Sequence, residues 1–221
     1  MFSNFSARIL KRGEPTHQEY FTYKDNLWYP IEAQGSTVPP DSETPGSFQF
    51  SVLSWNIDFM RPEEDARMAA ALQHLRSLVS GQADPSIILL NEMTEGDLRL
   101  IKMADWVRQS YNITDASTDH WESPSYGTTM LVHRALPIKS VFRVHYERTR
   151  MQRDALCVDI ALPQGQTLRV GTSHLESLKA DPPRRPSQLA TAAKYLHEEG
   201  VYAGIIGGDF NAIQDFDRML H

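Results

Sequence analysis

Four short hydrophobic segments, each followed at once by polar residues, constrain the fold of this 221-residue chain more than any other feature. They are SVLSWNID (Ser51–Asp58), SIILLNEM (Ser86–Met93), RVGTSHLES (Arg169–Ser177) and YAGIIGGDFN (Tyr202–Asn211). A single apolar run of this length is typical of a buried strand. Four runs that end in Asn, Glu, His and an Asp-x-Asn pair predict strand ends that meet at one rim, where loops carry a functional site.

Helices and further strands are expected between these segments. Apolar residues at helical spacing predict helices from Pro62 to just before Gly81, over about 95–110 and over about 187–199. Strand-like stretches follow the second helix: TTMLVHR, SVFRVHY, ALCVDIAL and TLRVGTSHL. The last two are joined by PQGQ, a short connection typical of a hairpin. Strands joined both by helices and by hairpins indicate mixed sheets covered by helices.

Composition narrows the functional classes. With 41% hydrophobic and 23% charged residues, the chain can bury one sizeable core. A net charge of −6 argues against a sequence-indifferent nucleic-acid coat, although a local basic groove is compatible with it. The single cysteine, Cys157, excludes an intrachain disulfide and is predicted to be a core residue. We see no secretory signal and no membrane-spanning run, so we expect a protein of the nucleus or cytoplasm with no membrane partner.

Residues 1–49 show no sustained periodicity and are predicted to form an N-terminal extension of a domain that occupies 50–221. The stretch AQGSTVPPDSETPGS has the Pro, Gly, Ser and Thr content of a linker. Just before it lie Trp28, Tyr29 and Ile31. We expect this aromatic surface to dock on the domain as an irregular arm, with a partner-binding patch as the alternative.

The first two hydrophobic segments end in candidate ligands. Glu92 follows a strongly apolar run, where a carboxylate has few partners unless a cation is present, and Mg²⁺ takes one or two carboxylates. A salt-bridged glutamate is the alternative. Asn56 offers an oxygen and an NH₂ group beside such a metal, or acts as a turn residue. Asp58 either caps the following helix or hydrogen-bonds a substrate group.

The last two segments end in candidate catalytic groups. His174 lies at a strand end among the polar residues Ser173, Glu176 and Ser177. It is either a packed or surface histidine or a donor to a phosphoryl oxygen whose charge grows in the transition state. Asp209 and Asn211 follow two glycines that permit close backbone approach. Two residues apart in a strand, they would share a face. Together they could orient an attacking water, whereas an Asp-x-Asn pair alone usually marks a turn.

Four motifs in this chain, taken in their order, resemble the endonuclease/exonuclease/phosphatase superfamily. They are WNID, a glutamate that follows a hydrophobic strand, SHLES and GDFN. WNID with TSHLES, and MQRDALCVDI with Arg153 before a cysteine-containing strand, are most similar to the 5′-tyrosyl-DNA phosphodiesterases. The resemblance covers about residues 50–215. It implies an α/β, DNase I-like four-layer α/β/β/α sandwich of two mixed sheets flanked by helices. Asn91 departs from the glutamine that usually precedes the metal-binding glutamate.

The resemblance implies a hydrolase that uses Mg²⁺ or Mn²⁺ to cleave the bond between a topoisomerase tyrosine and a DNA 5′ phosphate. Carried over by motif position, Glu92 and Asn56 would hold the metal, and Asp209, Asn211, His174 and Asn56 would be catalytic. Asp58, Arg153 and Ser177 would contact the substrate. The expected partner is DNA with 5′-phosphotyrosyl ends, single-stranded or frayed, bound by a monomer.

Basic residues near these motifs are further candidates for DNA contacts. Arg148 and Arg150 precede Arg153, and Lys179, Arg184 and Arg185 form a cluster that would contact phosphate or lie solvated on the surface. The same motifs would also serve an abasic endonuclease, an exonuclease or a head-group phosphatase, since each needs metal-assisted attack on a phosphate ester.

The superfamily continues beyond GDFN through further strands to an Asp-His pair, which this sequence lacks. His221 follows Asn211 too closely to replace that pair. We therefore expect a domain that is incomplete at its C-terminus and is weakly active or inactive. A non-catalytic remnant that binds DNA or protein is the alternative from a different functional class.

Overall fold

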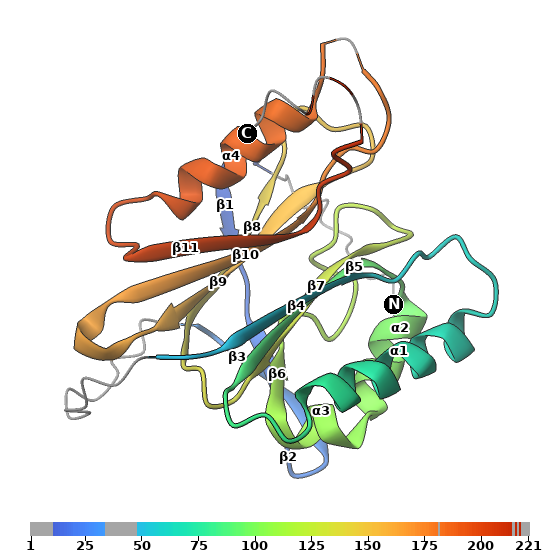
Figure 1. Ribbon diagram of the computed structural model, residues 1–221, viewed down its shortest axis with the longest axis vertical. Coiled ribbons are helices and arrows are strands. Elements are labelled where there is room, and N and C mark those ends of the chain that lie inside the picture. Colours follow the sequence, from blue (N-terminus) through green and yellow to red (C-terminus); the bar gives the residue numbers. More distant parts are fainter. Residues whose placement is uncertain (1–10, 34–47, 181, 214, 216, 218–221) are drawn as a thin grey trace, which may run out of the picture.

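Two mixed sheets pack face to face in the computed structural model, which describes residues 11–33, 48–180, 182–213, 215 and 217. Helices cover the outer face of each sheet, so that the layers follow the order α/β/β/α (Figure 1). This confirms the fold class expected from the sequence. The segment predicted to be a linker lies almost entirely outside the described residues, as does His221.

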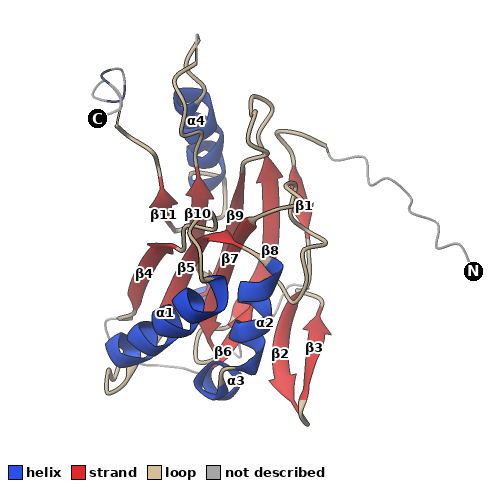
Figure 2. Ribbon diagram, turned by 90° about the vertical axis from the view of Figure 1, so that its right-hand side faces the viewer, coloured by secondary structure: helices blue, strands red, loops and turns tan. Residues whose placement is uncertain are grey.

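The five-stranded sheet is antiparallel except at one edge. Its strands lie in the order β1 (Pro15–His17), β8 (Ile138–His145), β9 (Asp154–Ala161), β10 (Thr167–His174) and β11 (Ala203–Asp209). The PQGQ connection forms the predicted hairpin between β9 and β10, with a 3-10 turn over Pro163–Gly165. Strands β10 and β11 run parallel, side by side (Figure 2).

The six-stranded sheet also ends in a parallel pair. Its order is β3 (Leu27–Ile31), β2 (Tyr20–Lys24), β6 (Tyr111–Ile113), β7 (Gly127–His133), β5 (Ser86–Met93) and β4 (Ser51–Asn56). Strands β4 and β5 are parallel, and all the other pairs are antiparallel. Each sheet therefore contributes one pair of parallel strands whose carboxyl ends lie together.

The helices follow the expected apolar stripes, with one difference. Helix α1 (Glu64–Val79) buries its apolar face, and α4 (Arg185–Leu196) covers the five-stranded sheet. The predicted helix over 95–110 is two helices, α2 (Glu95–Met103) and α3 (Asp105–Ser110). Ala104 separates them with an extended ψ of 117°, which breaks the helical hydrogen-bond ladder. None of the helices in the described residues is long and apolar enough to cross a membrane.

Apolar side chains from both sheets fill the space between them. This core includes Ile87 and Leu89 of β5, Met130 of β7, Val158 of β9 and Val170 of β10, all fully buried. A second core lies beneath α1, α2 and α3. Cys157 is buried against α4, and burial raises the pKa of its thiol to about 12, which confirms its prediction as a core residue.

The N-terminal segment is more regular than the sequence indicated. Strand β1 pairs with β8, while β2 and β3 form a hairpin that extends the other sheet. The segment docks on the domain as predicted, but the prediction that it is irregular is wrong. Asp25 and Asn26 form the two-residue turn of the hairpin, with φ of 49° and 64°. Two positive φ values in a two-residue loop are typical of a type I′ turn, whose twist matches that of the flanking strands.

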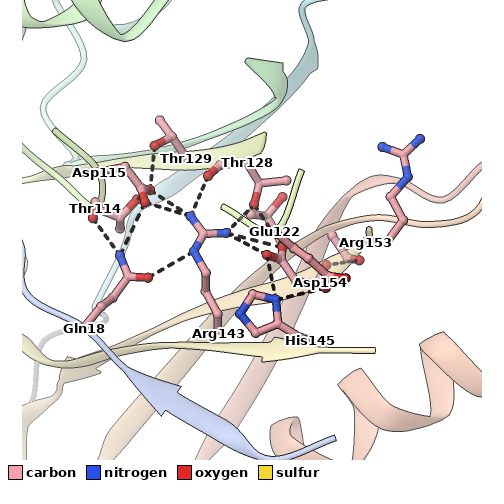
Figure 3. Close-up of polar contacts among 12 residues, drawn as sticks. Gln18, Thr114, Asp115, Glu122, Thr128, Thr129, Arg143, His145, Arg153 and Asp154 are labelled. Carbon is pink, nitrogen blue, oxygen red and sulfur yellow. Dashed lines mark hydrogen bonds and ion pairs between the residues drawn. The ribbon is translucent and has the colours of Figure 1, made fainter. Parts of the chain in front are cut away.

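A buried polar network joins the N-terminal segment to both sheets (Figure 3). At its centre, the Arg143 guanidinium contacts Asp115 at 2.9 Å and Asp154 at 3.2 Å. It also donates to Thr128 Oγ1 at 2.9 Å and to Gln18 Oε1 at 3.0 Å. The side chain of Arg143 is only 1% exposed. These contacts fix β8 against β9 at the point where β9 begins.

The network continues from Asp154 to the N-terminal segment. His145 Nδ1 lies 3.7 Å from Asp154 Oδ2 and 3.3 Å from Glu122 Oε2, and Arg12 forms an ion pair with Glu122. Burial tends to raise the pKa of Glu122, but hydrogen bonds and charges from His145 and Arg12 outweigh this effect and lower it. The carboxylate of Glu122 therefore stays charged, and it binds the start of the described chain to the fold.

Replacing Arg143 with Met is expected to lower the free energy of unfolding by about 3–5 kcal/mol, because it leaves Asp115 and Asp154 buried without their cation. Urea denaturation measures the change. The matched control is Arg99→Met, which removes an ion pair to Asp65 whose partners are both more than half exposed, and which should cost less than about 1 kcal/mol. Equal losses in the two variants would contradict this prediction.

Candidate functional site

The carboxyl ends of β4, β5, β10 and β11 bring the four sequence motifs together. In the parallel register, Asn56 lies opposite Asn91, and His174 lies opposite Asp209. Because the two parallel pairs belong to sheets that pack face to face, polar residues that are up to 153 positions apart in the chain come into contact.

Two carboxylates surround one amide at the centre of the site. Asn56 Nδ2 donates to Glu92 Oε1 at 3.2 Å and to Asp209 Oδ2 at 2.8 Å. Asn56 Oδ1 accepts a hydrogen bond from the Asp58 backbone at 2.9 Å. Asn56 is therefore a turn residue, and its amide nitrogen also lies between the two carboxylates.

A break in the strand register aims Glu92 into the site. The pairing of β5 with β7 shifts between Leu90 and Met93, and Glu92 adopts a left-handed φ of 57°. A bulge of this kind re-aims a side chain, and positive φ in a residue other than glycine is typical of strained functional positions. The backbone of Phe59 donates to Glu92 Oε2 at 3.2 Å, which fixes the other carboxylate oxygen.

His174 faces both carboxylates. Its Nε2 lies 3.6 Å from Glu92 Oε1 and 3.6 Å from Asp209 Oδ2, while the Arg153 guanidinium contacts its Nδ1. An arginine has no acceptor, so Nδ1 accepts this bond and the ring proton belongs to Nε2. Burial and the Arg153 charge lower the pKa of His174, against an opposing effect of Asp209. His174 is thus a neutral donor that points into the site.

Arg153 is held on the side of His174 away from the carboxylates. It directly precedes β9, and its guanidinium lies 4.9 Å from the centre of the Tyr126 ring. Burial lowers the pKa of Arg153, and Tyr126 and the nearby carboxylates oppose this effect. In Figure 3, Arg153 points away from the buried network around Arg143, whereas its neighbour Asp154 is part of that network. The first residues of β9 therefore lie between the site, which Arg153 contacts through His174, and the buried network.

The backbone of Asp209 is fixed from the facing sheet. Asn91 is fully buried; its Oδ1 accepts from Asp209 N at 3.0 Å, and its Nδ2 donates to Thr172 Oγ1 at 3.3 Å. In the sequence, Asn91 stands out only as a departure from the family pattern. Its amide occupies the contact between the sheets, and a polar residue inside so apolar a strand was the signal for such a role.

Gly208 permits the close approach that the GGDFN motif predicts. Its φ is 137°, and a Cβ at this position would lie 2.1 Å from the carbonyl oxygen of Ser173. A side chain there must displace β10 from β11 and so disturb both His174 and Asp209. The glycine is a steric requirement of the site.

Replacing Gly208 with Ala is expected to lower the free energy of unfolding by about 2–5 kcal/mol, from backbone strain and overpacking together. Thermal denaturation followed by circular dichroism measures the loss. The matched control is Gly171→Ala on the same pair of strands, where a Cβ would make only ordinary contacts, the nearest at 3.6 Å. A Gly208→Ala protein as stable as the control would show that the strands separate easily.

The other predicted residues lie at the border of the site. The Asp58 carboxylate accepts from Arg61 Nε at 3.0 Å. It does not cap helix α1, because the N-cap is Glu63. Ser177 lies beside the site, with its hydroxyl 3.3 Å from Met151 Sδ.

Asn211 differs from expectation because β11 ends at Asp209. Its φ is 47°, so the two side chains do not share a strand face. Asn211 N donates to Asp209 Oδ1 at 3.0 Å, and its side chain donates to the carbonyl of Leu175 at 3.0 Å. The Asp-x-Asn pair therefore forms a turn that orients the Asp209 carboxylate.

For Arg185, both interpretations of the basic cluster are wrong, the phosphate contact as well as the solvated surface charge. Arg185 is 1% exposed; it pairs with Asp217 at 2.7 Å and donates to the carbonyl of Glu176 at 2.8 Å. It is a structural residue of α4 rather than a phosphate contact or a solvated charge. Lys179 and Arg148 are exposed, and Arg148 donates to the carbonyl of Pro182 at 3.5 Å.

The donor set at the centre of the site fits a hard cation. Among the described residues, neither Glu92 nor Asp209 forms an ion pair with a lysine or arginine, although both surround the same amide. No group of three or more His, Cys, Asp and Glu side chains in the described part of the chain forms a metal cage. Mg²⁺ typically takes one or two carboxylates, with water and substrate oxygens completing its shell.

The fold and the site together define a sandwich of two sheets with paired carboxylates, a neutral histidine and an arginine at one rim. The family model for the endonuclease/exonuclease/phosphatase family matches residues 53–221. The chain belongs to this family.

Comparison with individual proteins gives a more specific result than the family model. The chain is 28% identical to tyrosyl-DNA phosphodiesterase 2 of Homo sapiens, in an alignment that covers 91% of this chain and 54% of that protein. It is 25% identical to the 5′-tyrosyl-DNA phosphodiesterase of Caenorhabditis briggsae, in an alignment that covers 81% of this chain and 49% of that protein. A structure of D. rerio TDP2 complexed with single-strand DNA product matches with a TM-score of 0.60 and 23% identity, covering 76% of this chain and 63% of that one. The chain thus spans about half the length of the curated relatives that it matches.

Proposed function

We propose that this chain is a divalent-metal-dependent phosphodiesterase that hydrolyses the bond between a tyrosine and a DNA 5′ phosphate. The observation that carries the proposal is the convergence of Asn56, Glu92, His174 and Asp209 at one rim. The names of the relatives and the single-strand DNA product of the D. rerio structure support the choice of substrate. The expected setting is the repair of topoisomerase-linked ends in the nucleus or cytoplasm, by a monomer.

Each residue has a role that its contacts support. Glu92, with Asn56 beside it, would hold Mg²⁺ or Mn²⁺, which supplies positive charge at the phosphoryl oxygens when it is bound. Asp209 orients and deprotonates the attacking water, and the turn at Asn211 keeps its carboxylate in place.

The histidine and the substrate-binding residues act on the phosphate. His174 donates a hydrogen bond from its Nε2–H group to a phosphoryl oxygen as charge develops there, because its Nδ1 is bound to Arg153. Asp58 and Ser177 border the site and would contact the DNA around the scissile phosphate, whereas Arg153, which is buried behind His174, would act on the phosphate through that histidine.

The test is the release of tyrosine from a 5′-phosphotyrosyl single-stranded oligonucleotide, with Mg²⁺ and with excess EDTA. A plain abasic duplex serves as the comparison substrate, and Mn²⁺ binding is followed by electron paramagnetic resonance. Tyrosine release that EDTA abolishes is expected. Cleavage of the abasic duplex alone would replace the substrate with that of an abasic endonuclease. A folded protein that binds Mn²⁺ and turns over neither substrate would be a non-catalytic member of the family.

A further inference from the structure

We propose that Glu176 is a positioning residue, which holds Arg153 and thereby His174 in their working arrangement through the loop that joins β8 to β9. This inference rests on the proposed function and deepens the account of the same site. The sequence placed Glu176 only among the polar neighbours of His174, whereas its contacts connect it to a different segment.

Glu176 is a buried carboxylate that binds a loop rather than a cation. The residue is 1% exposed, and among the described residues it forms no ion pair. Its Oε1 accepts hydrogen bonds from three consecutive residues: from Thr149 Oγ1 at 3.0 Å, Arg150 N at 2.7 Å and Met151 N at 2.8 Å. Its Oε2 lies 3.3 Å from Arg150 N. Because an ionised carboxylate only accepts hydrogen bonds, it suits this convergence of donors.

The loop bound by Glu176 sets the position of Arg153. Thr149 Oγ1, which donates to Glu176, accepts from Arg153 N at 2.9 Å. Met151 Sδ accepts from Arg153 Nη2 at 3.4 Å, and Met151 O accepts from Tyr126 OH at 2.6 Å. The loop therefore positions Arg153 in three ways. It binds the backbone N–H of Arg153, it binds Nη2 of the guanidinium, and it holds the Tyr126 ring that lies beside the guanidinium. Arg153 in turn contacts His174 Nδ1.

Helix α4 fixes Glu176 itself. Gln188 is 1% exposed; it accepts from Glu176 N at 3.0 Å and donates to the carbonyl of Arg148 at 3.0 Å. Arg185 donates to the carbonyl of Glu176 at 2.8 Å. The helix thus holds the carboxylate and the start of the loop at a fixed separation, so that a change at Glu176 reaches Arg153 directly.

The experiment compares Glu176→Gln with the control Asp97→Asn, a fully buried carboxylate that caps helix α2 away from the loop. In Glu176→Gln, amide hydrogen exchange at Arg150 and Met151 should rise about 10-fold, as expected for the loss of about 1.4 kcal/mol of hydrogen bonding. The ¹⁵N shift of His174 Nδ1 should move, and kcat should fall about 10-fold with KM nearly unchanged. Asp97→Asn should leave all three readouts unchanged.

Thr149→Val tests the same connection from the loop side, in case Glu176→Gln does not fold. It should shift His174 Nδ1 and lower kcat, and Thr149→Ser should restore both. An unchanged His174 shift in Glu176→Gln and Thr149→Val would overturn the inference, as would an equal fall in kcat for Asp97→Asn. If the wild type releases no tyrosine, the proposed function fails, whereas the exchange and His174 measurements still decide the inference.

Discussion

Replacing Glu92 with Gln is expected to lower kcat on the 5′-phosphotyrosyl substrate by at least about 100-fold while the protein stays folded. Loss of a group that only supports a metal ligand typically costs about 10–100-fold, so loss of the ligand itself should cost at least the upper end of this range. The amide keeps one oxygen to accept from the Phe59 backbone or from Asn56, so the bulge at this position should persist. Rates are measured across a Mg²⁺ titration.

The control for this variant is Glu95→Gln, an exposed carboxylate three positions further along the chain. It carries the same change in charge, so it tests whether net charge near the rim alters DNA binding. The Mn²⁺ affinity should fall in Glu92→Gln and stay constant in Glu95→Gln. Unchanged metal affinity together with full turnover in Glu92→Gln would remove Glu92 from the proposed metal site.

The rim of strand ends could be predicted because parallel strands place their carboxyl ends together. The apolar runs before Glu92 and Asp209 predicted buried strands with polar residues at their ends. This is right for β5, whereas β11 is a partly exposed strand at the edge of its sheet. Their mutual distance could not be predicted, since it depends on how the two sheets face each other. The bulge at Glu92 was equally hidden, because it follows from the pairing of β5 with β7.

The N-terminal strands were missed because they are short and only partly buried. Strand β1 has three residues, and β3 contains Pro30, which argues against a central strand but is tolerated at an edge. The Asp25-Asn26 pair between two aromatic runs was the one local signal of a hairpin. Pattern reasoning weights long apolar runs, and this segment has none.

Buried charges were the least predictable part of the chain. Arg143 interrupts an apolar strand, and Arg185 begins a helix next to the half-buried Arg184, so neither differs in sequence from a surface arginine. Their partners Gln18 and Asp217 are 125 and 32 positions away. Only the packing of distant elements decides which of these charges is buried, and a single sequence does not encode that packing locally.

Replacing Asp209 with Asn is expected to lower activity strongly while it changes stability little. Asp209 Oδ2 accepts from Asn56 and Oδ1 accepts from Asn211 N, so an asparagine retains one of these two hydrogen bonds. Losing the other costs about 1 kcal/mol, which relief of the repulsion from Glu92 offsets in the metal-free protein. The free energy of unfolding should therefore change by less than about 1 kcal/mol.

The same variant should lose about 10²–10⁴-fold in kcat, the usual contribution of a positioned general base, because the amide cannot take a proton from water. Single-turnover release of tyrosine at saturating Mg²⁺ measures this loss, and Asp105→Asn on the exposed surface is the control for charge. Turnover within 10-fold of wild type would show that Asp209 orients the water without deprotonating it. A large loss of stability would instead show that the hydrogen bond between Asn56 and Asp209 holds the two sheets together.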